Sequence, residues 1–387
     1  MAILSGDGTE PVDVLDKVAS IVPLVRQQRS AAEAAGRLGD EVVAALVEAG
    51  VTRLFLPSSL GGLEVDPVLC AKVTEMLARA DTAAAWFVMV ANSARLMAAY
   101  WPAELVEILW ADNPDAIVAA SGNRPLTGEA EKRGYRVSGF NSFVSGCHHA
   151  QWFLTPLIVG TERRMALLRM RDCEIVDNWQ VLGMRGSGSN DVRVHDVWIP
   201  ARQTVLMTEE PGERNRYYQG ALYRCPGRVV FATYVPVTLV LAEQALATLL
   251  DLAEQKSPYA TDEKLKHRSI AQVKYGKALA IHRSGRDYFY NALAQAWQRA
   301  QAGEEATPRQ KADLYLAGTH AVQSSAEVVG LVADAAGTSV IYEGQPLERI
   351  VRDMETLRHH GFASESRYGS VAQLYWGAKL DYPLMLR

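Results

Sequence analysis

The pattern of apolar and polar residues changes twice along the chain, and its first part is helical. In "DEVVAALVEAG" apolar positions recur at helical spacing, with Asp40 as a candidate N-cap and Gly50 as a candidate stop. From residue 67 to about residue 109 the helical period resumes, and the Ala-rich centre is apolar nearly all round, as in a buried helix. The pattern predicts an N-terminal helical domain over residues 1–115.

The middle of the chain has the pattern of a sheet. Short segments rich in β-branched and aromatic residues begin after about Asn113 and are separated by Gly, Pro, Asn and Asp. In "DVRVHDV", Val192, Val194 and Val197 are interleaved with polar residues at close to period two. We therefore predict a small β domain over residues 116–215.

Helical periodicity returns from about Gly220 and lasts to the C-terminus. In "AGEEATPRQKADLY", Thr307 is a candidate N-cap and Pro308 fits the first helical position. The longest apolar run, residues 229–242, is too short to span a bilayer and contains a proline. This third part, residues 216–387, completes an α+β fold that is mostly α.

Composition narrows the class of protein. The 387 residues are 49% apolar and 22% charged with a formal net charge of -4, so we expect neither nucleic acid nor an anionic membrane as a partner. No signal peptide is predicted at the N-terminus. The cysteines are widely spaced without a C-x-x-C pair, which argues against a zinc site or a disulfide framework. We expect a soluble cytoplasmic protein with no metal site.

Three stretches, in this order, carry a resemblance to a known family. They are "LPSSLGGLEVDP" followed by "ARADTAAAW", then "WQVLGMRGSGSNDVRVHDVWIPARQTV", and finally "GQPLERIVRD". Together they resemble the acyl-CoA dehydrogenase family over nearly the whole chain. The resemblance implies an N-terminal helical domain, a middle β domain and a C-terminal four-helix bundle.

One further stretch points to a branch of that family. "FNSFVSGCHHAQWF" resembles the group D flavin-dependent monooxygenases, whereas common dehydrogenases usually carry a Trp-Ile-Thr-Asn type of sequence there. The resemblance implies a two-component hydroxylase that receives reduced FMN or FAD from a separate NAD(P)H-dependent reductase. Such an enzyme uses O2 through a C4a-(hydro)peroxyflavin to oxidise a small aromatic or amine substrate. It also implies a homo-oligomer, expected to be a tetramer.

The segment after the Arg352-Asp353 pair supplies the candidate catalytic residue. Common dehydrogenases have a glutamate base roughly nine positions after this pair, but here the ninth position is Gly361 and the eighth is His360. The resemblance assigns His360 as a base or a substrate-orienting group, and an imidazole with a pKa near ~6.5 suits either role. Glu343 in "IYEG" precedes the pair, so we do not assign it as a base.

By resemblance, Ser145 supplies a hydroxyl to the flavin N5, and Gly146 lets the backbone approach the ring. The alternative is that these two residues only end a strand. Asn123 in "ASGNRPLTG" occupies the place where the family lays a loop along the flavin, but Asn before Arg-Pro is also an ordinary turn residue.

The remaining cofactor candidates lie in three separate segments. Ser187 and Ser189 in "RGSGSND" could bind the flavin chain or phosphate, or be plain loop hydroxyls. Their glycine spacing is not a dinucleotide fingerprint, because no βα unit surrounds it. By resemblance, Arg268 would bind the phosphate of a neighbouring subunit's flavin, and Ser339 would lie in the loop closing over the same phosphate.

Other charged and imidazole groups are predicted to be structural. We expect Arg352 and Asp353 to form an ion pair that anchors a helix. His148 and His149 beside the flavin strand are expected to be structural or to pack at the flavin edge, and His359 to be a helix-end neighbour.

Two other functions remain open from the sequence. One is an FAD-dependent acyl-CoA dehydrogenase whose base has moved to another helix. The other is a non-catalytic paralogue that keeps the fold but has lost cofactor binding.

Overall fold

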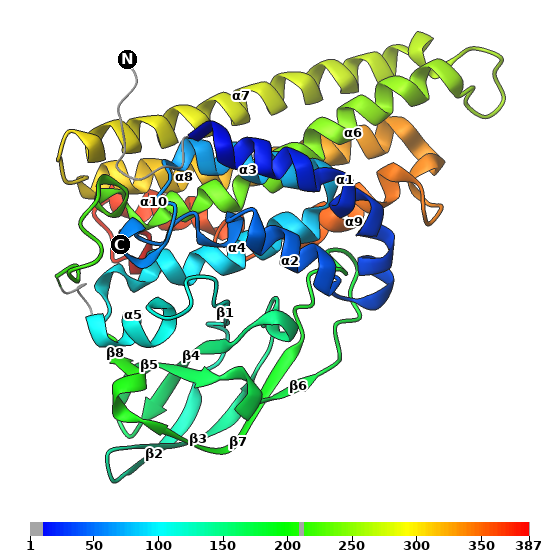
Figure 1. The fold of residues 1–387 in the computed structure, drawn as a ribbon. Helices are drawn as coiled ribbons and strands as arrows, with labels where there is room; N and C mark the ends of the chain where they lie inside the picture. Colours follow the sequence, from blue (N-terminus) through cyan, green and yellow to red (C-terminus); the bar gives the residue numbers. More distant parts are fainter. Residues whose placement is uncertain (1–10, 209–212, 387) are drawn as a thin grey trace. The chain divides into compact units, whose positions relative to one another are not determined.

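The computed structural model describes residues 11–208 and 213–386. They fall into two compact units, the first with residues 11–180, 185–208 and 213–223 and the second with residues 181–184 and 224–386. The order of elements is helices, then strands, then helices, so the predicted α+β, mostly helical class is confirmed (Figure 1). The domain boundaries predicted at residues 115 and 215 stay a prediction.

The helices of the first unit are α1 (Pro11–Ala35), α2 (Asp40–Glu48), α3 (Pro67–Ala80), α4 (Thr82–Met97) and α5 (Ala103–Trp110). The segment 67–109, predicted as one helical stretch, is interrupted twice. The backbone is extended at Asp81, and a short 3-10 turn, η3 (Ala98–Tyr100), separates α4 from α5. Asp66 caps α3 by accepting a hydrogen bond of 2.8 Å from the Leu69 amide.

The start of α2 differs from the prediction by one residue. Gly39 is the N-cap and makes no side-chain cap bond, so Asp40 is the first helical residue instead. A carboxylate in the first turn still interacts favourably with the helix dipole. Gly50 follows the helix in the left-handed conformation with φ of 77°, as expected for a glycine stop.

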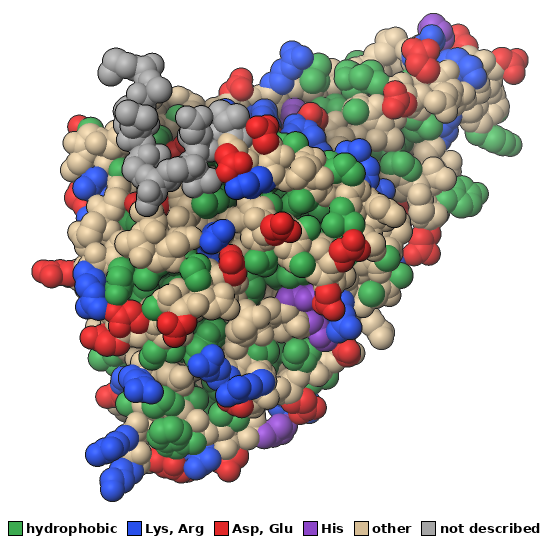
Figure 2. All heavy atoms as spheres, viewed as in Figure 1, with side chains coloured by type: hydrophobic (Ala, Val, Ile, Leu, Met, Phe, Trp, Pro, Cys, Tyr) green, Lys and Arg blue, Asp and Glu red, His purple; other side chains and the backbone are tan. Residues whose placement is uncertain are grey.

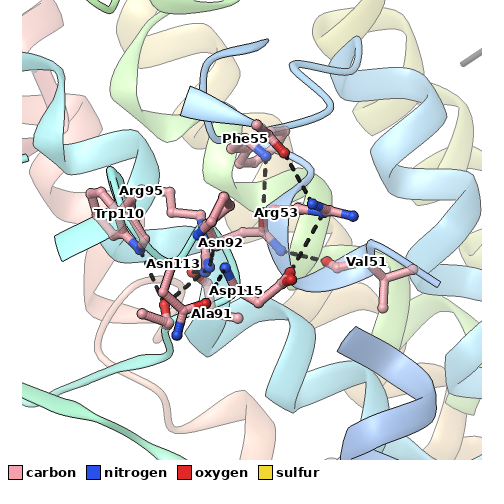
Figure 3. Close-up of polar contacts among 12 residues, drawn as sticks. Val51, Arg53, Phe55, Ala91, Asn92, Arg95, Trp110, Asn113 and Asp115 are labelled. Carbon is pink, nitrogen blue, oxygen red and sulfur yellow. Dashed lines mark hydrogen bonds and ion pairs between the residues drawn. The ribbon is translucent and has the colours of Figure 1, made fainter. Parts of the chain in front are cut away.

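Helix α4 is buried along nearly its whole length and is fixed by polar contacts inside the unit (Figure 3). Arg95 is fully buried and donates to the carbonyls of Ala91 at 2.6 Å and Pro114 at 2.8 Å. Burial lowers the pKa of Arg95 to about 10, so it stays charged at neutral pH. Asn92 donates to the Val51 carbonyl and accepts from the Phe55 amide. These bonds offset the cost of burying a cation and join α4 to the loops on either side of it.

The strands form a mixed sheet in the order β6-β7-β3-β2-β4-β5-β8, with β1 pairing with β4. Its buried face is apolar and forms its own core. The strands are β1 (Val118–Ala120), β2 (Leu126–Glu131), β3 (Gly134–Asn141), β4 (Trp152–Val159), β5 (Glu162–Arg169), β6 (Glu174–Val176), β7 (Asp191–Pro200) and β8 (Thr204–Leu206).

A bulge explains why the alternation in β7 is imperfect. Opposite β3, Gly139 pairs with Val194 and Val137 pairs with Val197, so β7 holds one extra residue between these pairs. Asp196 in the bulge has a positive φ of 51°. The extra residue moves the inward positions from even numbers, such as 194, to odd numbers, such as 199, so both Val194 and Ile199 are buried.

The surface charge of the sheet is mixed in sign. Figure 2 shows Lys and Arg side chains beside Asp and Glu side chains over this part of the face. Arg136 pairs with Glu131 at 3.1 Å and Arg164 pairs with Glu162 at 2.5 Å. Exposed pairs of this kind add little stability, but they prevent a field of a single sign.

The second unit is helical. Helix α8 packs against all the others, which are α6, α7, α9 and α10. Thr307 and Pro308 begin α8 as predicted, in a capping box with Gln310. The helices are α6 (Val235–Gln255), α7 (Ser269–Gln301), α8 (Pro308–Ala336), α9 (Pro346–Arg358) and α10 (Ser366–Tyr375).

The apolar run of this unit is a core helix. The helical stretch Gly227–Gln255 is long and apolar enough to cross a membrane by composition, but 89% of its most apolar window is buried inside the structure. Such burial is typical of the central helix of a bundle. The expected absence of a membrane partner stays a prediction.

The segment Val181–Met184 is held by α9. Arg352 donates to the Leu182 carbonyl at 3.0 Å, and Asp353 accepts from the Met184 amide at 2.6 Å. A Cβ on Gly183 would lie 2.1 Å from the Arg352 carbonyl oxygen, so only glycine fits there.

The prediction that Arg352 and Asp353 form an ion pair with each other is wrong. Arg352 pairs with Glu348, and Asp353 lies 3.5 Å from Arg349, because residues four apart share a helix face.

Candidate functional site

Three predicted serines meet in the first unit, where they form a serine cluster with the indole of Trp86. Ser145 Oγ lies 2.6 Å from Ser189 Oγ, which lies 2.8 Å from Ser187 Oγ. Trp86 Nε1, from α4, donates to Ser145 Oγ at 3.1 Å. All four side chains are buried. The hydroxyls therefore form one chain rather than separate loop groups.

The hydrogen bonds of the serine cluster leave one proton over. Each serine hydroxyl carries one proton, and the two bonds between serines use two of the three. The indole brings its own proton, so it uses none of them. Among the described residues these three hydroxyls have no further partner. One hydroxyl of the cluster can therefore donate to an acceptor outside it.

Ser145 lies in a sharp turn after β3 and not at the end of a strand, as the sequence predicts. Strand β3 ends at Asn141, and Ser145 and Gly146 form a turn into a 3-10 helix, η4 (Cys147–His149). Gly146 has a φ of 70° and its amide donates to the Ser187 carbonyl at 3.2 Å. A Cβ at this position would meet the ring of Phe87 at 3.1 Å. Glycine here thus lets the turn approach α4, which brings Ser145 to Trp86.

The two histidines of η4 hold this turn in place. His148 is within hydrogen-bond distance of Arg37 at 2.9 Å and of Asp177 at 3.0 Å. His149 Nε2 donates to the Leu38 carbonyl at 3.1 Å, and burial lowers the pKa of His149. Both imidazoles are engaged with protein groups, which supports the structural interpretation.

Asn123 lies in an exposed bend at the edge of the first unit. Its amide nitrogen donates to Ser142 Oγ at 2.8 Å, and its carbonyl oxygen has no hydrogen-bond partner among the described residues. The bend is fixed by Asn141, which is fully buried and donates to the Arg124 carbonyl at 2.6 Å. The sequence did not single out Asn141 or Trp86, because an asparagine at a strand end and a tryptophan in an apolar helix are both common.

His360 is the centre of a group in the second unit. This imidazole cluster consists of His360, Tyr234, Phe362 and Arg228. The His360 ring meets Phe362 edge to face at 4.8 Å and tilts against Tyr234 at 5.4 Å. Tyr234 donates to the Leu357 carbonyl at 2.7 Å, so its ring is fixed to the end of α9.

The bonds of His360 define its tautomer. The Phe362 amide donates to His360 Nδ1 at 3.3 Å, so Nδ1 carries a lone pair and the proton of the neutral ring is on Nε2. Burial, followed by the positive charge of Arg228, lowers the pKa of His360 to about 4. The ring is therefore neutral at physiological pH, with its proton on Nε2. His359 ends α9 and contacts Glu355 at 3.0 Å.

The candidate phosphate residues of the second unit lie apart from His360 along the chain. Arg268 is exposed and is the N-cap residue of α7, at the helix start where the sequence placed it. Ser339, in η10 (Gly337–Val340), accepts from Lys256 at 2.8 Å, which places a cation next to this hydroxyl. Glu343 lies in an exposed turn before α9. That position agrees with not assigning Glu343 as a catalytic base.

Comparison with known families identifies the class of protein. The acyl-CoA dehydrogenase N-terminal domain matches residues 18–101, and the acyl-CoA dehydrogenase C-terminal domain matches residues 232–365. Together these matches cover more than half of the chain. The chain belongs to the acyl-CoA dehydrogenase family, as its three motifs predict.

Characterised relatives narrow the class further. Indole-3-acetate monooxygenase of Pseudomonas putida is 28% identical over 350 residues, which are 87% of this chain and 87% of that protein. The flavin-dependent monooxygenase oxygenase subunit HsaA of Rhodococcus jostii (strain RHA1) is 26% identical over 363 residues, 89% of this chain and 93% of that one. The FADH(2)-dependent resorcinol hydroxylase, oxygenase component, of Rhizobium sp. (strain MTP-10005) is 24% identical, with 91% of each chain covered. These relatives are named monooxygenases or hydroxylases, which supports the prediction that the chain is an oxidoreductase.

Solved structures share the fold. The 3-HSA hydroxylase of Rhodococcus sp. RHA1 superposes with a TM-score of 0.86 at 23% identity, covering 96% of this chain and 98% of that one. XiaF from Streptomyces sp., in complex with FADH2 and glycerol, gives 0.86 at 19% identity and covers 96% of each chain. KijD3, in complex with FMN and a sugar nucleotide, gives 0.79 at 20% identity and covers 97% of this chain and 96% of that one. These similarities agree with the predicted fold.

Proposed function

We propose that this protein is the oxygenase component of a two-component system that hydroxylates a small aromatic substrate. Reduced FMN or FAD would come from a separate NAD(P)H-dependent reductase in the cytoplasm. The observation that carries the proposal is the serine cluster, a buried chain of three hydroxyls with one proton left to donate. A hydroxyl donor is what the resemblance requires beside the flavin N5, so the residues present fit this cofactor.

The described residues suit the handling of a flavin. In this proposal Ser145 donates to N5, with Trp86 and Ser189 holding the hydroxyl at its position. Asn123 offers its free amide oxygen, and Ser187 completes the hydroxyl chain. The buried apolar side chains of α4 and of the sheet core exclude water from this region. When bound, the reduced flavin would activate O2, and one atom of that O2 would enter the product.

For His360 the geometry favours one of its two predicted roles. A base must offer a lone pair, but the lone pair of His360 lies on Nδ1, which accepts from the Phe362 amide. The remaining nitrogen, Nε2, carries a proton. We infer that His360 orients the substrate through its neutral ring, which packs against Tyr234 and Phe362, instead of removing a proton. The aromatic rings of Tyr234 and Phe362 would flank an aromatic substrate.

Reaction with labelled oxygen tests the function. The full chain is mixed with chemically reduced FMN or FAD, labelled O2 and a panel that includes indole-3-acetate and resorcinol, the compounds named for two of its relatives. We expect one labelled oxygen atom in a product. Bound oxidised FAD bleached by an acyl-CoA would instead indicate a dehydrogenase, and the absence of flavin affinity would indicate a non-catalytic paralogue.

A substitution in the serine cluster links the function to this site. Ser145→Ala removes the N5 donor and leaves Trp86 Nε1 and Ser189 Oγ each with one partner fewer. We expect flavin consumption to continue while hydroxylation falls at least about tenfold and hydrogen peroxide rises. Ser138→Ala, in which the lost hydroxyl accepts only from the Asp196 amide at 2.9 Å, is the control and should hydroxylate normally. Equal yields from Ser145→Ala and wild type would remove Ser145 from the mechanism.

A further inference from the structure

Arg228 is a buried cation without an acidic partner among the residues that the structure describes. It lies in η8 (Gly227–Thr233), and its residue surface is 8% exposed. Its Nη2 donates to the Tyr382 hydroxyl and to the Leu384 carbonyl, both at 3.1 Å. Both acceptors are neutral. Across residues 11–208 and 213–386, no carboxylate forms an ion pair with this guanidinium.

Aromatic rings surround the same guanidinium. Its carbon lies 5.3 Å from the centre of Tyr315, 5.0 Å from Phe362 and 5.4 Å from Tyr382. Cation–π contacts of this kind each contribute of the order of 1 kcal/mol and leave the edge of the guanidinium free to bond. An aromatic enclosure holding a positive charge is complementary to an aromatic anion.

Part of the hydrogen-bonding capacity of Arg228 is unused. A guanidinium has five N–H donors, and the bonds to Tyr382 and Leu384 both come from Nη2. Within the described chain, Nε and Nη1 have no hydrogen-bond partner. Neither atom is fully enclosed by protein, because the enclosed unpartnered atoms are all on other residues. These nitrogens therefore retain contact with space that a small molecule or solvent can reach.

Arg228 also belongs to the imidazole cluster. It shares the Phe362 ring with His360, and its charge is close enough to disfavour protonation of that imidazole. An anion bound at Arg228 would lie within the same group of residues that we assign to substrate orientation. It would also offset the cost of a buried, uncompensated charge.

We propose that Arg228 binds the carboxylate of an aromatic substrate, with Tyr315, Tyr382 and Phe362 enclosing the charged end. The guanidinium edge matches a carboxylate in shape and charge, so a carboxylate is the anion best suited to it. This inference rests on the proposed function and narrows its substrate class to aromatic carboxylates. The competing explanation is that Arg228 only fixes the C-terminal segment through Tyr382 and Leu384.

Equilibrium binding separates the two explanations. The full chain, with and without reduced flavin, is titrated anaerobically with para-hydroxybenzoate and naphthylacetate and with the corresponding neutral amides. Each amide keeps the ring and removes the charge. We expect wild type to bind the carboxylates about tenfold or more tightly than the amides, as a charge-assisted bond predicts. Equal affinities, or no binding of either carboxylate, would overturn the proposal without any variant.

Variants then assign the preference to this side chain. Arg228→Gln should abolish the preference for carboxylates, and Arg228→Lys should keep part of it. Arg367→Gln is the matched control, because Arg367 lies over the Tyr382 ring at 4.2 Å and bonds the Gly361 carbonyl. It should loosen the C-terminal segment and leave the preference intact. A preference that survives in Arg228→Gln, or that Arg367→Gln removes equally, would contradict the assignment.

The binding preference for carboxylates is measured without any turnover. If neutral aromatics are hydroxylated but no carboxylate preference is found, this inference fails while the proposed function stands. If the preference is found without any oxygen transfer, the proposed function fails while the anion site stands.

Discussion

At the scale of single residues, His360 is the most direct test of the chemistry. His360→Ala removes the orienting imidazole and should leave flavin affinity unchanged while hydroxylation falls roughly a hundredfold. His359→Ala is the control, because that imidazole is exposed and bonds only Glu355 at 3.0 Å. Product formation is measured under single-turnover conditions with excess reduced flavin. Unchanged turnover in His360→Ala would exclude His360 from the mechanism.

The depressed pKa of His360 also predicts how stability depends on pH. Its pKa is about 4 in the folded chain and ~6.5 when unfolded, so the unfolded state binds the proton more tightly. The contribution of the neutral His360 ring to the free energy of unfolding is fully present above about pH 6.5. It is lost as the pH falls and the loss levels off below about pH 4, with a limit of about 3 kcal/mol.

Denaturant unfolding checks this pH dependence. Unfolding midpoints are compared at pH 7.5 and pH 4.5 for wild type and His360→Gln, which cannot titrate in this range. The variant should lose less stability on acidification than wild type. An identical loss in both proteins would show that His360 does not titrate between these pH values.

At the scale of elements, two glycines differ in how closely other atoms pack around them. A Cβ on Gly183 would lie 2.1 Å from the Arg352 carbonyl oxygen, so Gly183→Ala must displace the segment Val181–Met184 from α9. We expect a loss of about 2 kcal/mol or more, seen as a lower melting temperature. Gly330→Ala, within α8 and with nothing within 4 Å of its Cβ, should be neutral or stabilising by up to about 1 kcal/mol. Equal effects of the two substitutions would contradict this packing.

The elements also show what local sequence can and cannot predict. The start of α8 is determined by Thr307 and Pro308, because a cap acts within one turn, and it was correct. The end of β3 was placed too late, because Val144 and Ser145 have the composition of a strand but turn away to reach α4. The pairing of Arg352 and Asp353 was misassigned, since adjacent helical residues face different directions.

At the scale of the whole molecule, the family and fold were predictable because three motifs in order constrain the entire chain. The assembly of the candidate site was not predictable, because its contacts join distant residues. Ser145 and Ser189 are 44 positions apart, and Trp86 and Ser145 are 59 apart. Arg228 was missed because a single arginine at the start of an apolar run has the pattern of a core helix.

Exposed apolar side chains favour the homo-oligomer that the family resemblance implies. Ile270 and Val273 on α7 are 59% and 53% exposed, and Trp376 after α10 is 83% exposed. Such residues are commonly buried between copies of a chain. We expect sedimentation to give about four times the 42.4 kDa chain mass, and Ile270→Glu with Val273→Glu to lower it. A monomeric wild type would contradict the expectation of a tetramer.

The attachment of Val181–Met184 to α9 has a consequence for biosynthesis. Leu182 and its partner Arg352 are 170 positions apart, and Met184 and Asp353 are 169 apart. At ribosomal rates, roughly 10 to 30 s pass between the emergence of the two partners. During that interval the four residues have no docking partner, so a nascent chain halted before α9 would expose them to proteases and chaperones.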